Sequence, residues 1–415
     1  MIGLWFNHGD IHVRKNPEDL ESLKRFGFSD AFVLFKGGYC DQRDKPEDHK
    51  YLDFLISGLR RNDIRVHGVF YCSEDRKYIN RYPEKTDISV FGETNTRRIC
   101  HLDSEYIDYL NNSILTAAEE YGLDGIQLDF VRFGTLMNGW SPEEERIYSS
   151  FGVDVPAIKQ EILDRYDDIS GSNYNLGPIF ERYRNNDGQL SALAAARRSI
   201  LKSFVSRIAG TVRSELKDTV LSAAMMPEGM YPPWRGDAAL HYSQEFEDFE
   251  PYFDYMVPMV YAGTFNQSSG WVGTVAGNVS RSYPGSVIGL DSVEPRNSDG
   301  IRADIEAIRG QNHAGVCFFR YGRMILSMRE GPETVLYNTY PGQVTRLVLT
   351  EGDREKVVDC SIDEASWMRI EGQWERIRAF GSFASGRTQM YEGELCVLDR
   401  DMLDIYRRPV QTVGT

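Results

Sequence analysis

A buried strand that ends in a carboxylate is the first feature of the sequence that could do chemistry. In the stretch DGIQLDFVRF, Asp129 closes an apolar run and Arg132 follows three positions later. Alternate side chains of a strand point to opposite faces, so Ile126 and Leu128 share one face while Gln127 and Asp129 share the other. If helices cover the apolar face, Asp129 points inward, where an unpaired carboxylate is costly to bury.

Two interpretations of this carboxylate are open at the level of the residues. Asp129 and Arg132 could form a buried ion pair that only ties down the loop. Alternatively, Asp129 is catalytic, because residues at the carboxyl ends of strands in parallel barrels carry the chemistry of those enzymes. The second interpretation requires that the elements around the motif form a parallel barrel.

Eight short apolar runs recur in the first 330 residues, with helical patterns between them. They are residues 2–6, 31–35, 64–71, 124–130, 219–226, 255–261, 286–290 and 315–321. The helical stretch DSEYIDYLNNSILTAAEEYG stops at Gly122, which is a typical end signal. Eight strands alternating with helices predict a (β/α)8 TIM barrel of the α/β class, rather than an open doubly wound sheet with a glycine-rich first turn.

Two further segments complete the expected organisation. Roughly 85 residues separate the fourth and fifth runs, which is more than one helix requires. We therefore predict an insertion over about 135–190 that roofs the carboxyl face of the barrel and lines a substrate cleft.

After residue 341 the sequence alternates apolar and polar residues between Gly and Asp turns. We expect a barrel domain over 1–341 and a small β-rich domain over 342–415.

The fourth run also carries a family resemblance. YGLDGIQLDFVRF resembles the D-G-I-H-x-D-Y-I-R-Y signature of the glycosyl-hydrolase-like family 10 proteins, which are TIM-barrel glycosidases. The similarity extends to RVHGVFY, CHLDSEYIDYLNNSIL, LSAAMMPE and FDYMVPMVYAG, and it covers most of residues 1–330. The resemblance implies a barrel glycosidase that acts on an oligo- or polysaccharide.

Matched residue by residue, the family motif falls on positions 124–126, Asp129 and Arg132 of this chain. Gln127 stands where the family has a histidine, so the substrate preference of this chain is expected to differ. Related barrel glycosidases also carry a Met-x-Tyr at the sixth strand, which is similar to the Met-x-Tyr that ends at Tyr261 here.

Glycoside hydrolysis requires a second carboxyl group, which donates a proton or assists the attack. We predict Glu228 for this role, because it follows the fifth run at once and neighbouring Tyr231 and Trp234 could raise its pKa by desolvation. The alternative for Glu228 is a solvated loop carboxylate. Asp291 and Glu294, after the seventh run, are the other candidates for the second carboxyl group.

The remaining predicted site residues lie after strand runs or in loops. Sugar rings present apolar C–H faces to aromatic rings, which favours tryptophan and tyrosine in such positions. Lys36 and Arg320 have an alternative role, which is to neutralise the catalytic carboxylates. The full set of predicted substrate-binding residues is His8, Lys36, Arg132, Trp140, Trp234, Tyr261, Asp291 and Arg320.

The composition excludes several other classes of protein. The chain of 415 residues has a formal net charge of −15, which disfavours nucleic acids and anionic lipids as partners. Its six cysteines are widely spaced, so no disulfide framework or zinc site is predicted, and no cofactor is implied. The first residues fail the test for a signal peptide and no run is long enough to span a membrane, so we expect a cytoplasmic protein. The oligomeric state is not predicted.

Two alternatives to a glycoside hydrolase remain open. The first is a carbohydrate-binding protein on a degenerate barrel, without turnover. The second is a metal-dependent hydrolase that would use His8, Asp10, His67 and Asp291 as ligands.

Overall fold

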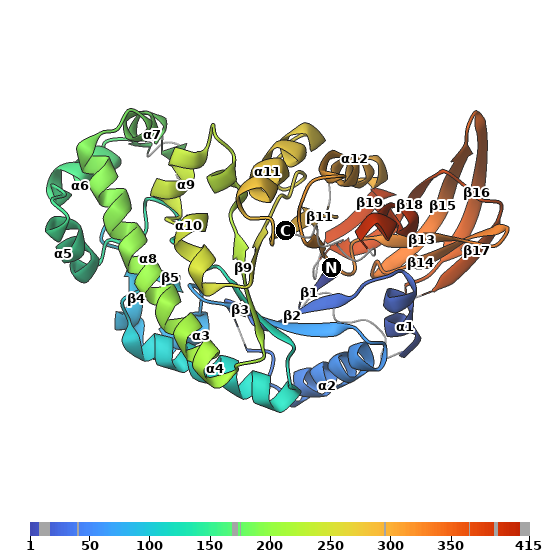
Figure 1. The fold of residues 1–415 in the computed structure, drawn as a ribbon, viewed down its shortest axis with the longest axis horizontal. Coiled ribbons are helices and arrows are strands. Elements are labelled where there is room, and N and C mark those ends of the chain that lie inside the picture. Colours follow the sequence, from blue (N-terminus) through green and yellow to red (C-terminus); the bar gives the residue numbers. More distant parts are fainter. Residues whose placement is uncertain are drawn as a thin grey trace, which may run out of the picture. The chain divides into compact units, whose positions relative to one another are not determined.

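The computed structural model describes residues 1–7, 17–39, 41–167, 173–174, 176–293, 296–364, 366–385 and 389–406. Eight parallel strands form the central sheet (Figure 1). These are β1 (Ile2–Phe6), β2 (Asp30–Lys36), β3 (Arg65–Tyr71), β6 (Gly125–Asp129), β9 (Val220–Met225), β10 (Tyr255–Pro258), β11 (Val287–Asp291) and β12 (Gly315–Phe319). Each of the eight predicted runs supplies one of these strands.

The order of the strands closes the sheet into a barrel. Along the sheet the order is β10-β9-β6-β3-β2-β1-β12-β11, which is the chain order taken around a ring. At the ends of this list, Met259 and Gly289 lie in parallel register, and Val260 N donates a hydrogen bond of 2.9 Å to Gly289 O. The predicted (β/α)8 TIM barrel is confirmed.

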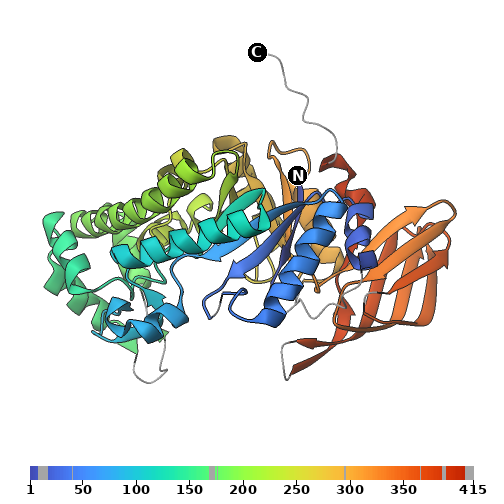
Figure 2. The same cartoon turned by 90° about the horizontal axis from the view of Figure 1, so that it is seen from below.

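Helices connect successive strands of the barrel, as Figure 2 shows from a second direction. They include α1 (Pro17–Arg25), α2 (Pro46–Arg61), α4 (Ser104–Tyr121), α8 (Gly188–Glu215), α11 (Ser269–Ser282) and α12 (Ser298–Ile308). Helix α4 begins at the capping residue Asp103, whose side chain accepts from Glu105 N, and it ends at Gly122. Gly122 has φ of 56°, a left-handed conformation that glycine adopts without strain, so the predicted stop signal is confirmed.

The chain divides into two compact units, and the strands of the barrel are shared between them. One unit comprises residues 1–34, 45–67 and 257–415, and the other comprises residues 35–44 and 68–256. The first unit contains β1, β11, β12 and the C-terminal sheets. The second contains β6, β9 and the long segment between them.

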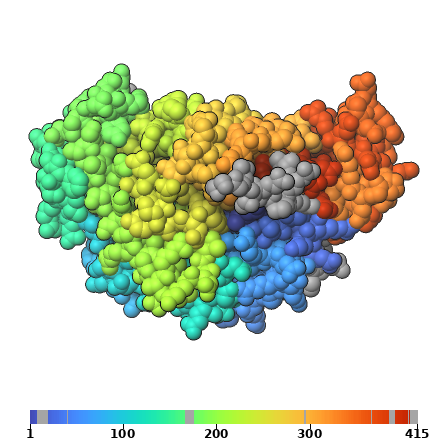
Figure 3. Space-filling view, viewed as in Figure 1, coloured from blue at the N-terminus to red at the C-terminus, as the bar shows by residue number. Residues whose placement is uncertain are grey.

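An insertion separates β6 from the helix that leads to β9, as predicted. It contains α5 (Pro142–Ser150), α6 (Val155–Leu163), β7 (Tyr166–Asp167), β8 (Asn173–Tyr174) and α7 (Gly177–Arg184). Helix α5 begins with a capping box, in which Ser141 and Glu144 exchange hydrogen bonds between side chain and backbone. On the face drawn in Figure 3, the green atoms of this region pack against the yellow-green atoms of α8. That the insertion lines a substrate cleft stays a prediction.

Arg197 of α8 holds the first loop of the insertion in place. Its side chain is fully buried, and its guanidinium lies 4.1 Å from the centre of the Phe133 ring. It donates hydrogen bonds to Asn138 O at 2.7 Å and to Thr135 O at 3.0 Å. Since buried carbonyl groups need donors, this arginine fixes the path of the chain after β6.

The C-terminal part of the first unit consists of two four-stranded sheets. One sheet has the order β17-β14-β13-β20 and the other has the order β16-β15-β18-β19. The strands are β13 (Ile325–Glu330), β14 (Glu333–Asn338), β15 (Gly342–Glu351), β16 (Arg354–Ile362), β17 (Trp367–Glu371), β18 (Arg376–Ser385), β19 (Gln389–Leu395) and β20 (Val397–Asp399). The predicted C-terminal β structure is confirmed, and its first strand begins at Ile325. The division into domains at residue 341 stays a prediction.

Candidate functional site

Asp129 is the last residue of β6 and lies almost entirely out of solvent, at 5% exposure. Its Oδ1 atom accepts a hydrogen bond of 2.6 Å from Phe130 N. Burial raises the pKa of Asp129, and the nearby charge of Arg132 opposes that rise. Phe130 has φ of 53°, which is an uncommon backbone conformation for a bulky residue and turns the chain sharply after the strand.

The guanidinium of Arg132 faces back toward this carboxylate. Its Nη1 atom lies 3.7 Å from Asp129 Oδ1, and its Cζ atom lies 4.4 Å from the centre of the Phe130 ring. Nη1 is buried and has no hydrogen-bond partner in the described part of the chain. The predicted pairing of Asp129 with Arg132 is therefore present, at a distance that leaves donor capacity of the arginine unused.

Ser73 and His101 fix the backbone of the loop that carries Arg132. Ser73 Oγ accepts a hydrogen bond of 3.4 Å from Arg132 N and lies 2.8 Å from Nε2 of His101. Burial, together with the charges of Arg98 and Arg197, lowers the pKa of His101 to about 3. His101 is therefore neutral at physiological pH and serves here as a hydrogen-bonding partner, without adding a charge to the site.

Glu228 lies in the short 3-10 helix η3 (Pro227–Met230), directly after β9. It is 9% exposed, and its Oε2 atom has no hydrogen-bond partner among the described residues. Burial raises the pKa of Glu228 to about 7, while the charge of Arg132 opposes the rise. A buried carboxyl group with this pKa can donate a proton near neutral pH. The alternative of a solvated loop carboxylate does not fit its burial.

Arg132 thus acts electrostatically on both predicted carboxyl groups. Its charge lowers the pKa of Asp129 and that of Glu228, against the effect of burial in each case. The two acids come from the ends of different strands, β6 and β9, which pair in parallel register. The strand-end loops therefore bring Arg132 within electrostatic range of both Asp129 and Glu228.

A third buried carboxylate, Glu74, was missed by the sequence analysis. It follows β3, is 4% exposed, and pairs with Arg97 at 3.0 Å and with Arg98 at 2.9 Å. Its negative charge contributes to the raised pKa of Asp129. The acidic pair in the stretch YCSEDR, at the end of the third strand run, was the signal that could have revealed it.

Lys36 lies at the end of β2, as predicted, but its partner is another carboxylate. Its Nζ atom is 2.8 Å from Asp75 Oδ2 and donates to Tyr106 Oη at 3.2 Å. Asp75 also caps α3 (Arg76–Arg81) by accepting a hydrogen bond from Tyr78 N. Because Lys36 is 1% exposed and has these partners, its position favours a structural role over contact with substrate.

Three predicted residues belong to the other unit. Tyr261 stacks on Phe319 with ring centres 5.4 Å apart, and the guanidinium of Arg320 lies 5.4 Å from the centre of the same ring. Asp291 is fully buried and accepts hydrogen bonds from Gly263 N and from both the backbone and the hydroxyl of Thr264. Both of its oxygens are occupied in holding that loop, which makes it a weaker candidate than Glu228 for the second carboxyl group.

The predicted tryptophans differ in what they offer to a ligand. Trp140 is 1% exposed, donates a hydrogen bond to Leu136 O and packs edge-on against Tyr148, so it has no open face for a sugar ring. Its expected role as a stacking platform does not fit this burial. Trp234 is half-buried and meets Tyr231 edge-on, with ring centres 4.9 Å apart, shortly after Glu228. Its predicted role in binding fits this placement and stays a prediction.

The ligands of the alternative metal site are only partly described. His8, Asp10 and the further candidate Glu294 lie outside the described residues. His67 is fully buried, lies 2.8 Å from Asp30 through Nε2 and stacks on Phe32. Within the described ranges, no group of three or more His, Cys, Asp and Glu side chains is placed to hold a metal ion.

None of the described helices has the length and apolar character required to cross a bilayer.

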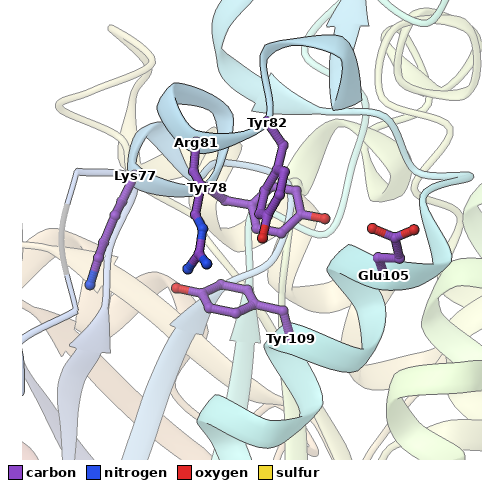
Figure 4. A pocket seen from close by; sticks show the side chains of 6 residues that line it. All are labelled: Lys77, Tyr78, Arg81, Tyr82, Glu105 and Tyr109. Carbon is purple, nitrogen blue, oxygen red and sulfur yellow. The ribbon is translucent and has the colours of Figure 1, made fainter.

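A separate pocket of about 240 Å³ lies between α3 and α4. Figure 4 shows its lining, which consists of Lys77, Tyr78, Arg81, Tyr82, Glu105 and Tyr109. The Tyr78 hydroxyl donates to Asp103, and Lys77 pairs with Asp44 at 2.5 Å. None of the buried carboxylates described above lines this pocket, so it is distinct from the site around Asp129.

Comparison with known proteins supports the fold. No family model matches the chain, and no curated protein matches it in sequence. Among solved structures, the chain is similar to the catalytic domain of a β-amylase from Paenibacillus polymyxa. The TM-score is 0.57 at 10% identity, with coverage of 77% of this chain and 92% of the amylase domain.

Two β-galactosidases have similar scores. The enzyme from the psychrophilic Marinomonas ef1 gives a TM-score of 0.55 at 12% identity, covering 78% of this chain and 54% of the galactosidase. A catalytic mutant of the GH42 enzyme Gan42B from G. stearothermophilus gives 0.52 at 13% identity, covering 77% and 51%. The chain therefore spans about half the length of these two galactosidases. These neighbours are glycoside hydrolases, and they do not single out family 10. At such identities the comparison shows that the chain has the TIM-barrel fold of these enzymes.

Proposed function

We propose that the chain is a glycoside hydrolase that cleaves an oligo- or polysaccharide with two carboxyl groups. The observation that carries this proposal is the pair of buried strand-end acids, Asp129 and Glu228, that share the charge of Arg132. Carbohydrate cleavage requires two carboxyl groups in different environments, one protonated and one ionised. The similarity of the fold to an amylase and to galactosidases supports the same class of reaction.

The two acids take different roles in this proposal. Glu228, with a pKa of about 7, is the general acid that protonates the leaving glycosidic oxygen. Asp129, whose ionised form is favoured by the charge of Arg132, either attacks the anomeric carbon or activates a water molecule opposite it. Trp234, half-buried shortly after Glu228, is proposed to stack against a sugar ring on the leaving-group side.

The proposal is tested by incubating the purified protein with a panel of aryl glycosides and polysaccharides and measuring the release of reducing ends. The anomeric configuration of the first product, followed by NMR, distinguishes direct attack by Asp129 from attack by water. Binding of a glycan without release of reducing ends would contradict hydrolysis. It would favour the alternative of a carbohydrate-binding protein.

Replacing Arg132 with alanine is expected to lower kcat/KM by about 10- to 100-fold and to move the pH profile upward. The guanidinium lowers the pKa of both carboxyl groups, so its removal raises both. Asp129 must be ionised and Glu228 protonated, and hence both limbs of the profile shift to higher pH. A profile of kcat/KM from pH 4 to 9 measures this shift.

Arg207→Ala provides the matched control, because that arginine of α8 is exposed and its nearest carboxylate lies 3.9 Å away. The control is expected to match the wild type in rate and in pH profile. An Arg132→Ala enzyme with an unchanged profile would contradict the electrostatic effect of Arg132 on the two acids.

A further inference from the structure

Tyr39 is an exposed aromatic residue close to an arginine that pairs with the buried carboxylate Glu74. It follows β2 and is 58% exposed, the largest fraction among the large hydrophobic side chains in the described part of the chain. The guanidinium of Arg97 lies 5.2 Å from the centre of its ring, and that of Arg76 lies 5.9 Å away. An exposed ring close to two guanidinium groups offers both an apolar face and positive charge.

Short contacts connect Gly38, the residue before this tyrosine, to Arg76 and Glu74. The carbonyl of Gly38 accepts a hydrogen bond of 2.8 Å from Arg76 N. A Cβ atom on Gly38 would lie 3.0 Å from Glu74 Oε2, so glycine permits this loop to approach Glu74 closely. Glu74 in turn lies within electrostatic range of Asp129. Tyr39 therefore lies next to a loop residue that approaches Glu74, the carboxylate whose charge acts on Asp129.

Arginines lie around Tyr39 although the chain as a whole is acidic, with 62 acidic and 47 basic residues. Arg97 and Arg98 both pair with Glu74, and the guanidinium of Arg76 lies near the Tyr39 ring. Arg76 is exposed and has no carboxylate partner within the described ranges, and the side chain of Arg97 is 49% exposed although it pairs with Glu74. Unused guanidinium donors at an exposed position are suited to bind a carboxylate in bidentate fashion.

We propose that Tyr39, Arg76 and Arg97 form a subsite for an acidic sugar residue, so that the substrate is a glycan bearing carboxylate groups. The sugar ring would lie against the tyrosine, and its carboxylate would bind the guanidinium groups. This inference rests on the proposed function and names the substrate class of that site. A neutral glycan would use the aromatic face and leave the exposed Arg76 unused.

The subsite is tested by binding rather than by turnover, in the Asp129→Asn background to prevent cleavage. The probes are polygalacturonate, alginate and hyaluronate, each compared with its methyl ester, which keeps the backbone and removes the charge. At least one acidic polymer is expected to bind about tenfold more tightly than its ester in affinity electrophoresis. Arg76→Ala and Arg97→Ala are each expected to weaken that binding by about tenfold and to leave binding of the ester unchanged.

Variants of Tyr39 separate the aromatic contribution from the charge. Tyr39→Ala is expected to weaken binding of the acidic polymer and of its ester alike, whereas Tyr39→Phe keeps the ring and is expected to bind like the parent. Phe151→Ala is the control for loss of an exposed ring, since Phe151 is 44% exposed in the insertion. Arg354→Ala is the control for loss of an arginine over a ring, since its guanidinium lies 5.1 Å from the Trp374 ring. Neither control is expected to change binding.

Two results would overturn the subsite. One is equal binding of every acidic polymer and its ester, and the other is unchanged binding by both arginine variants. These results are independent of the hydrolase proposal. If the wild type binds an acidic polymer but cleaves none of them, hydrolysis is contradicted. If Arg97→Ala then weakens that binding, the acidic subsite is still supported.

Discussion

Replacing Asp129 with asparagine is expected to lower kcat/KM on a cleaved glycan on the order of 10³-fold or more while the fold is retained. Asparagine has nearly the same shape and can still accept the hydrogen bond from Phe130 N. It cannot stabilise positive charge at the anomeric carbon, which is the contribution that the proposed mechanism requires of Asp129. Initial rates and thermal melts of the wild type and the variant, at one pH, measure both effects.

A purely structural ion pair would give the opposite ordering. In that case Asp129→Asn would leave the buried guanidinium of Arg132 without its counter-charge and lower the melting temperature, and activity would fall only with stability. A variant that is active and as stable as the wild type would remove Asp129 from the catalytic pair. Arg207→Ala again provides the control for handling and expression.

Replacing Glu228 with glutamine is expected to abolish the proton donation that the leaving group needs. The loss should be on the order of 10²- to 10⁴-fold for a poor leaving group and much smaller for an activated aryl glycoside, which departs without a proton. Comparing kcat for a natural linkage with kcat for a nitrophenyl glycoside measures this difference. An equal loss on both substrates would contradict the role of Glu228 as the acid.

The same substitution is expected to stabilise the protein at alkaline pH. The pKa of Glu228 is about 7 in the folded chain, above its usual value of 4.5, so the folded state holds its proton more tightly than the unfolded state. The resulting stability is fully present below about pH 4.5 and is lost as the pH rises through about 7. Glutamine avoids the charged form, so the variant should gain up to roughly 3 kcal/mol over the wild type at pH 8.

The stability of the variant must be compared with that of the wild type at each pH, because other buried acids also change protonation state. Burial also raises the pKa of Asp87 to about 6 and that of Glu144 to about 7, so the wild type and the variant both lose stability as the pH rises. Denaturant unfolding of both proteins at pH 5 and pH 8 isolates the contribution of Glu228. If the difference in stability between the two proteins does not change with pH, the raised pKa of Glu228 in the folded state is contradicted.

The barrel could be predicted because its signal is local. Strands buried on both sides read as short apolar runs whatever lies around them, and all eight were found from the sequence. Asp129 could be found for the same reason, since a carboxylate at the end of such a run is conspicuous. Glu228 was found as a neighbour of the fifth run, although its burial depends on residues that pack around it in the fold.

The remainder of the site depends on contacts between distant segments. Trp140 looked like an exposed loop aromatic, but Leu136 and Tyr148 of the same insertion enclose it. Lys36 looked like a counter-charge for the catalytic acids, but its ion-pair partner is Asp75, which follows the next strand. Glu74 gains its importance from Arg97 and Arg98, which lie more than 20 positions further along the chain. Such pairings follow from the tertiary structure and leave no periodic pattern in the sequence.

The junction between β10 and β11 has a consequence for motion in the barrel. At the four strand pairs β1–β12, β1–β2, β11–β12 and β6–β9, three to five paired residues are described, whereas Met259 and Gly289 are the one parallel pair described at this junction. Gly289 allows this approach, since a Cβ atom there would lie 2.9 Å from Pro258 O. With fewer backbone hydrogen bonds to break, this junction is expected to open by sub-global fluctuation at a lower free energy than those four strand pairs. Amide hydrogens near it would then exchange with solvent long before those of β1 or β12.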